Sequence, residues 1–553
     1  MKKTVCIITA FLLIIGLSSC AGNDAGGDGT DAGNGSGSVA SPVTDASVNA
    51  SEATGDFAVA TSDGKFTLDG GVCTITSGGT YSLSGRFEGR IVVDAGDGSD
   101  VVIELNGVTV IGSDDSPVKI LSAGDVDISA KKGTENLISD TRTAKTADDA
   151  SQGEGAISSE TDLKLKGTGT LVVSAGYNNG IHTAKDLKIQ KLSLKVTAPN
   201  NALRGGDSVE ILSGTVIAIS TGGDGIKTVS TDTDKSGNTR GDVLILGGSV
   251  AVYAAGDGIQ AAHSFALAST DGEAAPSLSI YTGSYSGYTA SSASVSSYKG
   301  IKAQNELTVS AGLLTVQSYD DGLHADIGTV FEDGTKGLGA VSISGGSVVI
   351  SVYSPENKTF GGRQGPGGRQ GFQQATVSGA DGIHSDGTLS VSGGNIVIDS
   401  AYEGLEANVI EISGGNTKVA ANDDGINACR GASTPLVSVS GGFLDVSVPA
   451  GGDTDGIDSN GSYRQTGGIV IARGPNSEMA AALDADGTVT VSGGTLIILG
   501  YGRVSASGGV SSYSLSLHSE GSHTVTVGTV TYTFENSSSY GRTVCYSDVK
   551  VSS

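Results

Sequence analysis

The chain has 553 residues, and its 59 acidic side chains outnumber the 33 basic ones to give a formal net charge of −26. A surface with this charge repels phosphate backbones, so nucleic-acid binding is disfavoured. Glycine is abundant at 87 residues and proline is scarce at 9, and valine, isoleucine, serine and threonine are frequent. This composition is typical of many short strands joined by tight turns, and not of a disordered chain.

The N-terminus has the pattern of an exported protein. Two lysines precede an apolar run from Val5 to Leu17, which is too short to span a bilayer and is typical of a signal sequence. The segment Leu17–Cys20 resembles the lipobox of bacterial lipoproteins. We therefore predict a lipoprotein signal peptide at 1–19 and an acylated anchor at Cys20; the alternative is an ordinary signal peptide with an accidental cysteine.

Residues 20–58 are mostly glycine, aspartate, serine, alanine and asparagine. Such a segment has almost nothing to bury, so we predict a disordered tether. The mature protein is then an extracytoplasmic lipoprotein exposed at the cell surface, and it contacts the membrane only through its anchor. The three remaining cysteines, Cys73, Cys429 and Cys545, have no metal-binding spacing and are interpreted as buried structural thiols.

From residue 154 onwards one phrase keeps returning: an acidic or amide residue, then glycine, then isoleucine or leucine. Two short stretches of alternating apolar residues follow it. The glycines of the clear copies are Gly180, Gly225, Gly258, Gly322, Gly382, Gly404, Gly425 and Gly456, and looser copies surround Gly155, Ala202 and Gly300. A fixed period is the signature of a repeat architecture.

The repeat beginning at Asp381 illustrates its physical content. Leu389 and Val391, then Ile396 and Ile398, alternate as in strands with one buried face, and a Ser-Gly-Gly break separates the two stretches. Where no polar insertion intervenes, the apolar residues of successive phrases lie 21 to 24 residues apart. Leucine-rich repeats have a similar length, but their Leu-x-x-Leu-x-Leu frame is missing.

We therefore predict an all-β, right-handed parallel β-helix with turns of about 22 residues and three strands each. One domain covers 59–512, with atypical first turns at Phe66–Thr134. Residues 513–553 form a C-terminal β cap, because such solenoids must cover their open ends. We expect a monomer.

Stacking turns each position of the repeat into a ladder. The residue before the glycine gives an acidic ladder, in which like charges repel by about 1 kcal/mol per neighbouring pair. Some of these side chains could cap turn amides, which accounts well for Asn179 and Asn201. Ca²⁺, which takes six to eight oxygen ligands, would relieve the rest. The predicted metal ligands are Asp224, Asp257, Asp320, Asp321, Asp381, Glu403, Asp423, Asp424, Asp453, Asp455 and Asp458.

The residue after each isoleucine or leucine should point outward, because side chains alternate along a strand. This outward ladder is basic in its middle and acidic at its C-terminal end, and it places His324 next to His384. It consists of Ser158, His182, Arg204, Lys227, Gln260, Lys302, His324, His384, Glu406, Asn427, Asp458 and Asp484. A mixed, solvated face is the alternative interpretation.

The Asp-Gly-Ile turns, the stretch Tyr81–Gly85 through Val108, and the segment Gly133–Asn136 followed by Asp140 resemble a known family. It is the family of bacterial carbohydrate-binding domain proteins with a calcium-bearing parallel β-helix, similar in fold to pectate lyases. The resemblance covers about residues 60–510. It implies an extracytoplasmic protein, structural Ca²⁺, and binding of acidic, pectin-like polysaccharide or cellulose.

Three functions stay open. The first is a non-catalytic, surface-tethered binder of acidic polysaccharide such as polygalacturonate. The second is a Ca²⁺-dependent polysaccharide lyase; by resemblance its base would be Lys302, Lys227 or Arg204, which needs a lowered pKa. The third is a β-helical surface adhesin. The chain lacks tryptophan, so an aromatic platform for crystalline cellulose is not favoured, and the loop 361–372 offers two arginines as a contact arm.

Overall fold

The computed structural model describes residues 48–145, 151–270, 272–287, 297–353 and 379–553. The predicted signal peptide (1–19), the acylation site Cys20 and the loop 361–372 lie outside these residues. The chain divides into two units, 1–40 and 41–553, and all described residues belong to the second. Within the described part the only helix is the 3-10 turn η1 (Gly283–Ser286), and no helix there is long and apolar enough to cross a membrane.

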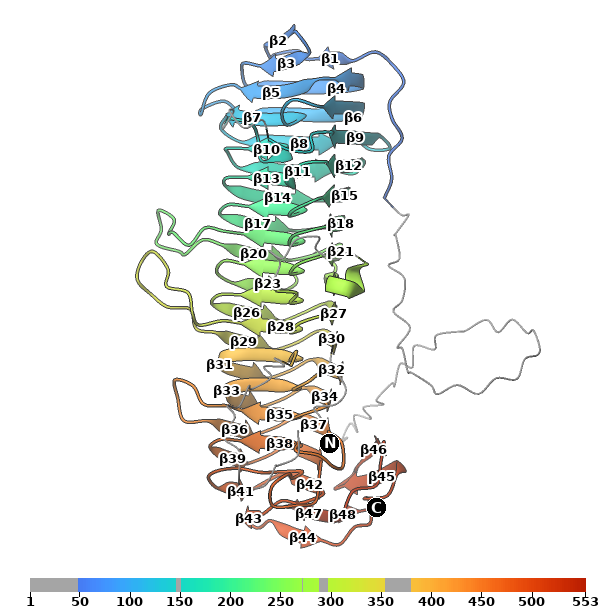
Figure 1. The fold of residues 1–553 in the computed structure, drawn as a ribbon, viewed down its shortest axis with the longest axis vertical. Coiled ribbons are helices and arrows are strands. Elements are labelled where there is room, and N and C mark those ends of the chain that lie inside the picture. The colour runs from blue at the N-terminus through green and yellow to red at the C-terminus, as the bar shows by residue number, and fades with distance from the viewer. Residues whose placement is uncertain (1–47, 146–150, 271, 288–296, 354–378) are drawn as a thin grey trace, which may run out of the picture. The chain divides into compact units, whose positions relative to one another are not determined.

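Three strands form each turn of a parallel β-helix, and strands of successive turns stack to build three long sheets (Figure 1). This confirms the predicted all-β solenoid. From β10 onwards the repeated phrase begins each strand of the first sheet, the first alternating stretch lies in the second sheet, and the second stretch lies in the third. Each turn of the β-helix therefore contributes one strand to each of the three sheets, always in the same order.

The strands of the first sheet are short, and from β10 onwards they begin at or directly after the phrase. They are β3 (Val72–Ile75), β5 (Arg90–Asp94), β7 (Val118–Ser122), β10 (Gly155–Ser159), β13 (Asn179–Thr183), β16 (Leu203–Gly205), β19 (Ile226–Thr228), β22 (Ile259–Ala261), β25 (Ile301–Ala303), β28 (Leu323–Ala325), the first residues of β31 (Ile383–Val391) and of β33 (Leu405–Ile412), β35 (Ile426–Ala428) and β38 (Ile457–Ser459).

The later residues of β31 and β33 belong to the second sheet, and its other strands are separate from those of the first sheet. They are the first parts of β4 (Gly79–Glu88) and β6 (Val101–Gly112), then β8 (Val126–Ala130), β11 (Leu163–Gly167), β14 (Asp186–Gln190), β17 (Ser208–Ile211), β20 (Asp242–Ile245), β23 (Phe265–Leu267), β26 (Glu306–Val309), β29 (Ala340–Ile343), β36 (Leu436–Val439), β39 (Ser462–Gln465), β41 (Val489–Val491) and β43 (Ser505–Ala506).

The third sheet follows the glycine turns. It consists of the last parts of β4 and β6, then β9 (Glu135–Asp140), β12 (Thr170–Ala175), β15 (Leu192–Ala198), β18 (Gly214–Ser220), β21 (Ser249–Ala254), β24 (Ser277–Thr282), β27 (Leu313–Ser318), β30 (Ser347–Val352), β32 (Asn395–Ser400), β34 (Asn416–Ala420), β37 (Phe443–Ser447), β40 (Ile469–Arg473) and β42 (Thr495–Leu499).

The core lies between the three sheets, because every second residue of each strand points inward. Ile181, Leu203 and Ile226, which occupy one position on successive turns, are completely buried. The glycine of the phrase is required by close packing. A Cβ added to Gly225 would lie 2.1 Å from Val252 Cγ1 and 2.7 Å from the carbonyl oxygen of Gly258 on the next turn.

The predicted Ser-Gly-Gly breaks are turns between the second and third sheets. Gly394 has φ = +84°, a conformation that favours glycine, and an added Cβ would lie 2.9 Å from the carbonyl oxygen of Gly345 on the preceding turn. The predicted strand break and its conformational reason are therefore both present in the structure.

Residues 48–58, which the sequence analysis assigns to the tether, lie against the β-helix. Val48 is 3% exposed and packs with Ile217 and Tyr253. Phe57 stacks on Phe87 with ring centroids 4.2 Å apart, and β1 (Ala58–Ala60) pairs with β4 in antiparallel orientation. The packed part of the chain thus starts before the predicted boundary at residue 59. A hairpin of β2 (Phe66–Asp69) with β3 precedes the first full turn.

The C-terminal segment closes the last turn and also covers one side of it. β47 (Thr543–Ser547) pairs in antiparallel orientation with β42 and with β44 (Ser511–Tyr513). β45 (Gly521–Val527), β46 (Val530–Asn536) and β48 (Val551–Ser552) form a separate small sheet. Its Phe534 packs in one apolar cluster with Ile471 and Ile497, which face outward from the third sheet.

Candidate functional site

The first sheet carries the two predicted ladders in the predicted register. His182 pairs with Arg204, Arg204 with Lys227 and Lys227 with Gln260, and the pairing continues through Lys302 to His324 and His384. Glu406, Asn427 and Asp458 follow on the next turns. The outward ladder is therefore a continuous row of side chains along the first sheet. Most of its members are half-buried, while Ser158 and His182 are buried.

The residues before the glycines line one corner of the β-helix, where they bond from turn to turn. Asp224 Oδ1 accepts the backbone N–H of Asp257 (3.0 Å), and Asp424 Oδ1 accepts that of Asp455 (2.8 Å). Asp321 Oδ1 accepts the N–H of Asp381 in the same way (2.8 Å). These three side chains, predicted as metal ligands, thus cap the amide of the following turn, a role that the sequence analysis assigned to Asn179 and Asn201.

In the N-terminal part of this corner the chain supplies its own neutralising groups. Lys227 Nζ lies 2.8 Å from Asp224 Oδ2, and Lys145 forms an ion pair with Glu154. Asn179 and Asn201 carry no charge, and Asn201 Nδ2 donates to Asn179 Oδ1 (2.8 Å).

The doublet Asp320–Asp321, predicted as a cation corner, is held by a lysine. Lys299 Nζ lies 2.7 Å from Asp321 Oδ2 and 3.0 Å from Asp320 Oδ2. The pKa of Asp321 is lowered despite its burial, because His324 and Lys299 both bond to its carboxylate. Asp257 is nearly buried and next to Asp224, and these two effects raise its pKa to about 6.

The C-terminal part of the corner is different. Burial and neighbouring carboxylates raise the pKa of Asp424 to about 8 and that of Glu403 to about 7. The same causes raise Asp455 to a pKa of about 7 and Asp458 to about 6. None of these four groups has a lysine or arginine within 4 Å among the residues that the structure describes. Asp423 and Asp453 lie on the same turns and add to the negative field.

An orphaned oxygen lies among these carboxylates. Asn427 Nδ2 donates to Glu403 Oε2 (3.0 Å), but the buried Asn427 Oδ1 has no hydrogen-bond partner in the described part of the chain. A buried amide oxygen without a donor is costly. The candidate metal ligands of this region are thus all oxygen atoms, and one of them, Asn427 Oδ1, accepts no hydrogen bond from the described residues.

Among the residues that the lyase hypothesis names, Arg204 has a lowered pKa, and burial is the main cause. Within the described residues no hydrogen bond or salt bridge reaches its guanidinium, which lies in the field of Glu154. Lys227 is engaged by Asp224, and Lys302 Nζ lies 3.8 Å from Asp326 Oδ2. His182, next to Arg204, has its pKa lowered to about 4, first by burial and then by Arg204.

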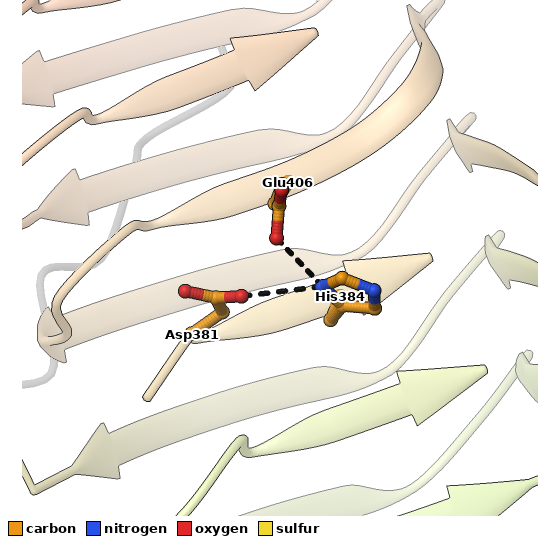
Figure 2. Close-up of side chains that lie close together, drawn as sticks. All are labelled: Asp381, His384 and Glu406. Carbon is orange, nitrogen blue, oxygen red and sulfur yellow. Dashed lines mark hydrogen bonds and ion pairs between the residues drawn. The ribbon is translucent and has the colours of Figure 1, made fainter. Parts of the chain in front are cut away.

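Between the two parts of the corner, the outward ladder and the acidic corner meet. Figure 2 shows His384 on β31 between Asp381, at the start of that strand, and Glu406 on β33. His384 Nδ1 lies 2.7 Å from Glu406 Oε2 and 3.2 Å from Asp381 Oδ2. The carboxylates raise the pKa of His384 to about 12 against the opposing effect of burial. Sequence analysis placed these residues on neighbouring turns but did not combine them into one cluster.

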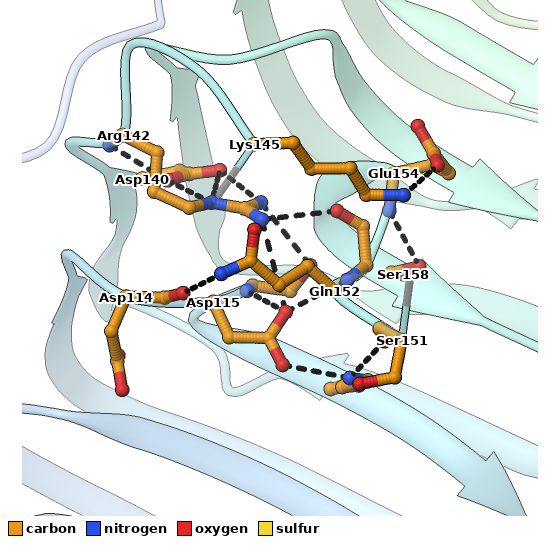
Figure 3. Close-up of polar contacts among 12 residues, drawn as sticks. Asp114, Asp115, Asp140, Arg142, Lys145, Ser151, Gln152, Glu154 and Ser158 are labelled. Atoms are coloured by element: carbon orange, nitrogen blue, oxygen red, sulfur yellow. Dashed lines mark hydrogen bonds and ion pairs between the residues drawn. The ribbon is translucent and has the colours of Figure 1, made fainter. Parts of the chain in front are cut away.

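Sequence analysis also missed a buried polar network where the phrase begins (Figure 3). Arg142 bonds to Asp140 through Nε and Nη2 (2.9 and 2.6 Å) and to the carbonyl oxygen of Gly153 (3.1 Å). Lys119 Nζ lies 2.7 Å from Asp115 Oδ2, and Asp115 Oδ1 accepts the N–H of Gly153. The network fixes Gly153 just before β10, and the sequence did not reveal it because Asp115 and Gly153, which it joins, are 38 residues apart.

A parallel β-helix with polar ladders on one sheet defines the class of protein. A sequence model described as "Carbohydrate-binding domain-containing protein" matches residues 69–350 and 331–425. The chain belongs to this carbohydrate-binding domain-containing protein family.

A curated carbohydrate-binding domain-containing protein of Acetivibrio thermocellus is 36% identical over 126 residues, which is 22% of this chain. The matched region spans 44% of that relative's length, less than half of it. A solved structure, a gadolinium derivative of the polysaccharide lyase-like protein from C. thermocellum, is 29% identical and has a TM-score of 0.39. That match covers 45% of this chain and 92% of the other.

Proposed function

We propose that this protein binds polysaccharide without cleaving it, that acidic glycans of the polygalacturonate type are preferred, and that Ca²⁺ stabilises its C-terminal turns. Membership of the carbohydrate-binding domain family supports the general class of ligand. The preference for an acidic ligand rests on one observation, the basic stripe of the outward ladder.

This basic stripe consists of Arg204, Lys227 and Lys302, with Gln260 between the two lysines. Turns of the β-helix are separated by about 4.8 Å, so Arg204 lies one turn from Lys227, whose ammonium also pairs with Asp224, and Lys302 lies two turns further along. This linear arrangement suits an extended polyanion. Arg204 is the strongest candidate contact, because a guanidinium pairs with a carboxylate through two parallel hydrogen bonds. Its half-burial strengthens such a pair by lowering the local dielectric.

Ca²⁺ fits the C-terminal part of the corner. Its preferred ligands are carboxylate and amide oxygens in flexible geometry, and the region offers Glu403, Asp424 and the orphaned Oδ1 of Asn427. Asp455 and Asp458 offer a second group of carboxylates on the next turn. When bound, the ion supplies the positive charge that no lysine or arginine of the described residues provides within 4 Å of these carboxylates. Asp224, Asp320 and Asp321 are weaker candidates, because lysines already neutralise them.

The lipobox-like segment completes the proposal. Acylation at Cys20 would tether the β-helix outside the cytoplasmic membrane, where polysaccharides of the surroundings are accessible.

Titration of the protein with oligogalacturonides in the presence of Ca²⁺ tests the binding function. We expect Arg204→Gln to weaken binding about tenfold, the loss that corresponds to one charge-assisted hydrogen bond. Lys188→Gln is the matched control, since Lys188 lies on the second sheet and pairs with Glu210 at 2.5 Å. Equal affinity for a neutral glucan would refute the acidic preference.

The same mixtures distinguish a binder from a lyase. A lyase produces unsaturated uronate ends, which absorb in the ultraviolet, so a non-catalytic binder leaves the absorbance unchanged. An absorbance increase that Lys302→Ala or Arg204→Gln abolishes would overturn the non-catalytic assignment.

A further inference from the structure

We infer that Asp381, His384 and Glu406 form a site for a divalent transition-metal ion of the Zn²⁺ type, separate from the calcium corner. One nitrogen and two carboxylate oxygens of these residues lie within 4.8 Å of one another. The three residues come from two neighbouring strands of the first sheet, so the backbone ladder holds their spacing (Figure 2). This site does not depend on the proposed polysaccharide binding.

The type of donor selects the ion. Ca²⁺ takes oxygen ligands, whereas an imidazole nitrogen with carboxylates suits Zn²⁺ and its neighbours in the first transition row. His384 Nδ1 faces both carboxylates, at 2.7 Å from Glu406 and 3.2 Å from Asp381. A metal ion bound there replaces the proton on Nδ1, and that proton leaves to solvent.

The surroundings of His384 are those of a metal ligand. Its second nitrogen, Nε2, lies 3.3 Å from Asp386 Oδ1, and Asp386 Oδ2 accepts the backbone N–H of Ile327 (2.9 Å). A carboxylate on the second nitrogen is the usual way in which proteins orient a metal-binding histidine. Asp386 therefore acts as a positioning residue, not as a ligand.

Two further groups border the site. The thiol of Cys429 hydrogen-bonds to Glu406, which brings a soft ligand to the edge of the donor set. The ring of His324 stacks on that of His384, with centroids 4.6 Å apart and planes 8° from parallel. The Nδ1 of His324 is occupied by Asp321 at 2.8 Å, so this ring is a wall of the site and not a fourth donor.

The site is accessible to an ion in solution. The side chains of His384 and Glu406 are each 20% exposed, and that of Asp381 is 9% exposed. Partial exposure allows exchange, while the stacked His324 and the strand ladder limit the freedom of the ligands. A water molecule would complete a tetrahedral set.

Calorimetric titration of the full chain with ZnCl₂ tests the inference, using protein purified without a histidine tag, treated with chelator and then supplied with millimolar Ca²⁺. We expect one Zn²⁺ per chain that Ca²⁺ does not displace. His384→Gln and Glu406→Gln should each abolish measurable binding, and Asp386→Asn should weaken it roughly tenfold, as outer-shell partners do. Co²⁺ should give the visible absorption of a site with nitrogen ligation, and His384→Gln should remove it.

His324→Gln is the matched control, because it removes the stacked imidazole but none of the three donors, and we expect binding within a few-fold of the parent. Melting curves establish that each variant is folded, and two independent ligand variants guard against the misfolding of one. The inference is overturned if the parent chain binds no Zn²⁺, if Ca²⁺ displaces Zn²⁺, or if folded His384→Gln binds as tightly as the parent.

Discussion

The two parts of the acidic corner share one backbone and differ in how their charge is balanced. From Glu154 to Asp321 the carboxylates pair with Lys145, Lys227 and Lys299, except for Asp257, whose pKa is raised to about 6. From Glu403 to Asp458 comparable carboxylates have raised pKa values and no cationic partner among the described residues.

The difference separates two roles of the residue before the glycine. One oxygen caps the amide of the next turn, a role that asparagine and aspartate fill equally, as Asn201 Oδ1 and Asp224 Oδ1 do. The second oxygen adds only charge. Where aspartate or glutamate has no lysine or arginine within 4 Å among the described residues, the raised pKa lets a proton neutralise the charge, and in our proposal Ca²⁺ does so at higher pH.

The largest expected effect is the loss of stability when the glycine of the phrase is replaced by alanine. It should be the same in both parts of the corner, because their backbones pack in the same way. A Cβ on Gly225 would meet Val252 Cγ1 at 2.1 Å, and a Cβ on Gly425 would meet Val446 Cγ1 at 2.2 Å. We expect Gly225→Ala and Gly425→Ala each to lower stability by about 3 kcal/mol, at the upper end of overpacking costs. Thermal and urea unfolding measure this loss.

Gly98→Ala is the control, because nothing lies within 4 Å of a Cβ at that position. If Gly425→Ala were much milder than Gly225→Ala, the two parts would differ in backbone packing as well as in charge.

The second prediction concerns pH and chelation. Asp424, Glu403 and Asp455 have folded-state pKa values of about 8, 7 and 7, above the value of about 4 expected in the unfolded chain. The folded chain then holds protons that the unfolded chain releases, so the contribution of these three groups to stability is greatest at low pH and falls as pH rises from about 4 to 8. We expect chelated protein to be about 2 kcal/mol less stable at pH 8 than at pH 5, after discounting for solvent screening.

Ca²⁺ should raise the melting temperature at pH 8 much more than at pH 5, because protonated carboxylates bind it poorly. If neither chelator nor Ca²⁺ changed the melting temperature at pH 8, the calcium proposal would be refuted. The acidic ladder would then be stabilised only by its hydrogen bonds to backbone amides.

A matched pair of substitutions tests directly whether charge is balanced differently in the two parts of the corner. Asp224→Asn and Asp424→Asn both retain the oxygen that caps the next amide. In chelator at pH 8, Asp424→Asn should stabilise the protein by about 1 kcal/mol, because it removes an unbalanced buried charge. Asp224→Asn should destabilise it by a similar amount, because Lys227 loses its partner. With Ca²⁺ present, both variants should be less stable than the parent; the same sign for both variants in chelator would contradict the comparison.

Much of this fold is predictable from sequence because its period is short and repeats. The spacing of Ile157, Ile181 and Leu203 gives the turn length, and alternation then gives the face on which His324 and His384 become neighbours. A one-residue error would have moved the whole row to the core, so the register was strongly determined.

The balance of charge was not predictable. Lys299 occupies an acidic-ladder position, and nothing local indicates that its side chain pairs with both Asp320 and Asp321 on the following turn. Val48 lies in a polar segment typical of a tether, yet it packs against Ile217 and Tyr253, which are far away in the sequence. Long side chains and long-range contacts of this kind carry no periodic signal.

The smallest expected effect comes from a substitution that leaves a carboxylate of the N-terminal part without a cationic partner, as in the C-terminal part. Lys227→Met keeps the apolar stem but removes the ammonium that lies 2.8 Å from Asp224 Oδ2. A half-buried pair of this kind contributes on the order of 1 kcal/mol, so the loss at pH 8 should be small. At pH 5 in chelator the loss should be smaller still, because Asp257, whose pKa is raised to about 6, then holds a proton and no longer repels Asp224.

Melting curves of Lys227→Met at pH 5 and pH 8 measure this difference, and Lys227→Arg, which keeps the charge, should behave as the parent does. If Lys227→Met lost equal stability at both pH values, the lysine would act through packing of its stem. The charge balance that separates the two parts of the corner would then not depend on this pair.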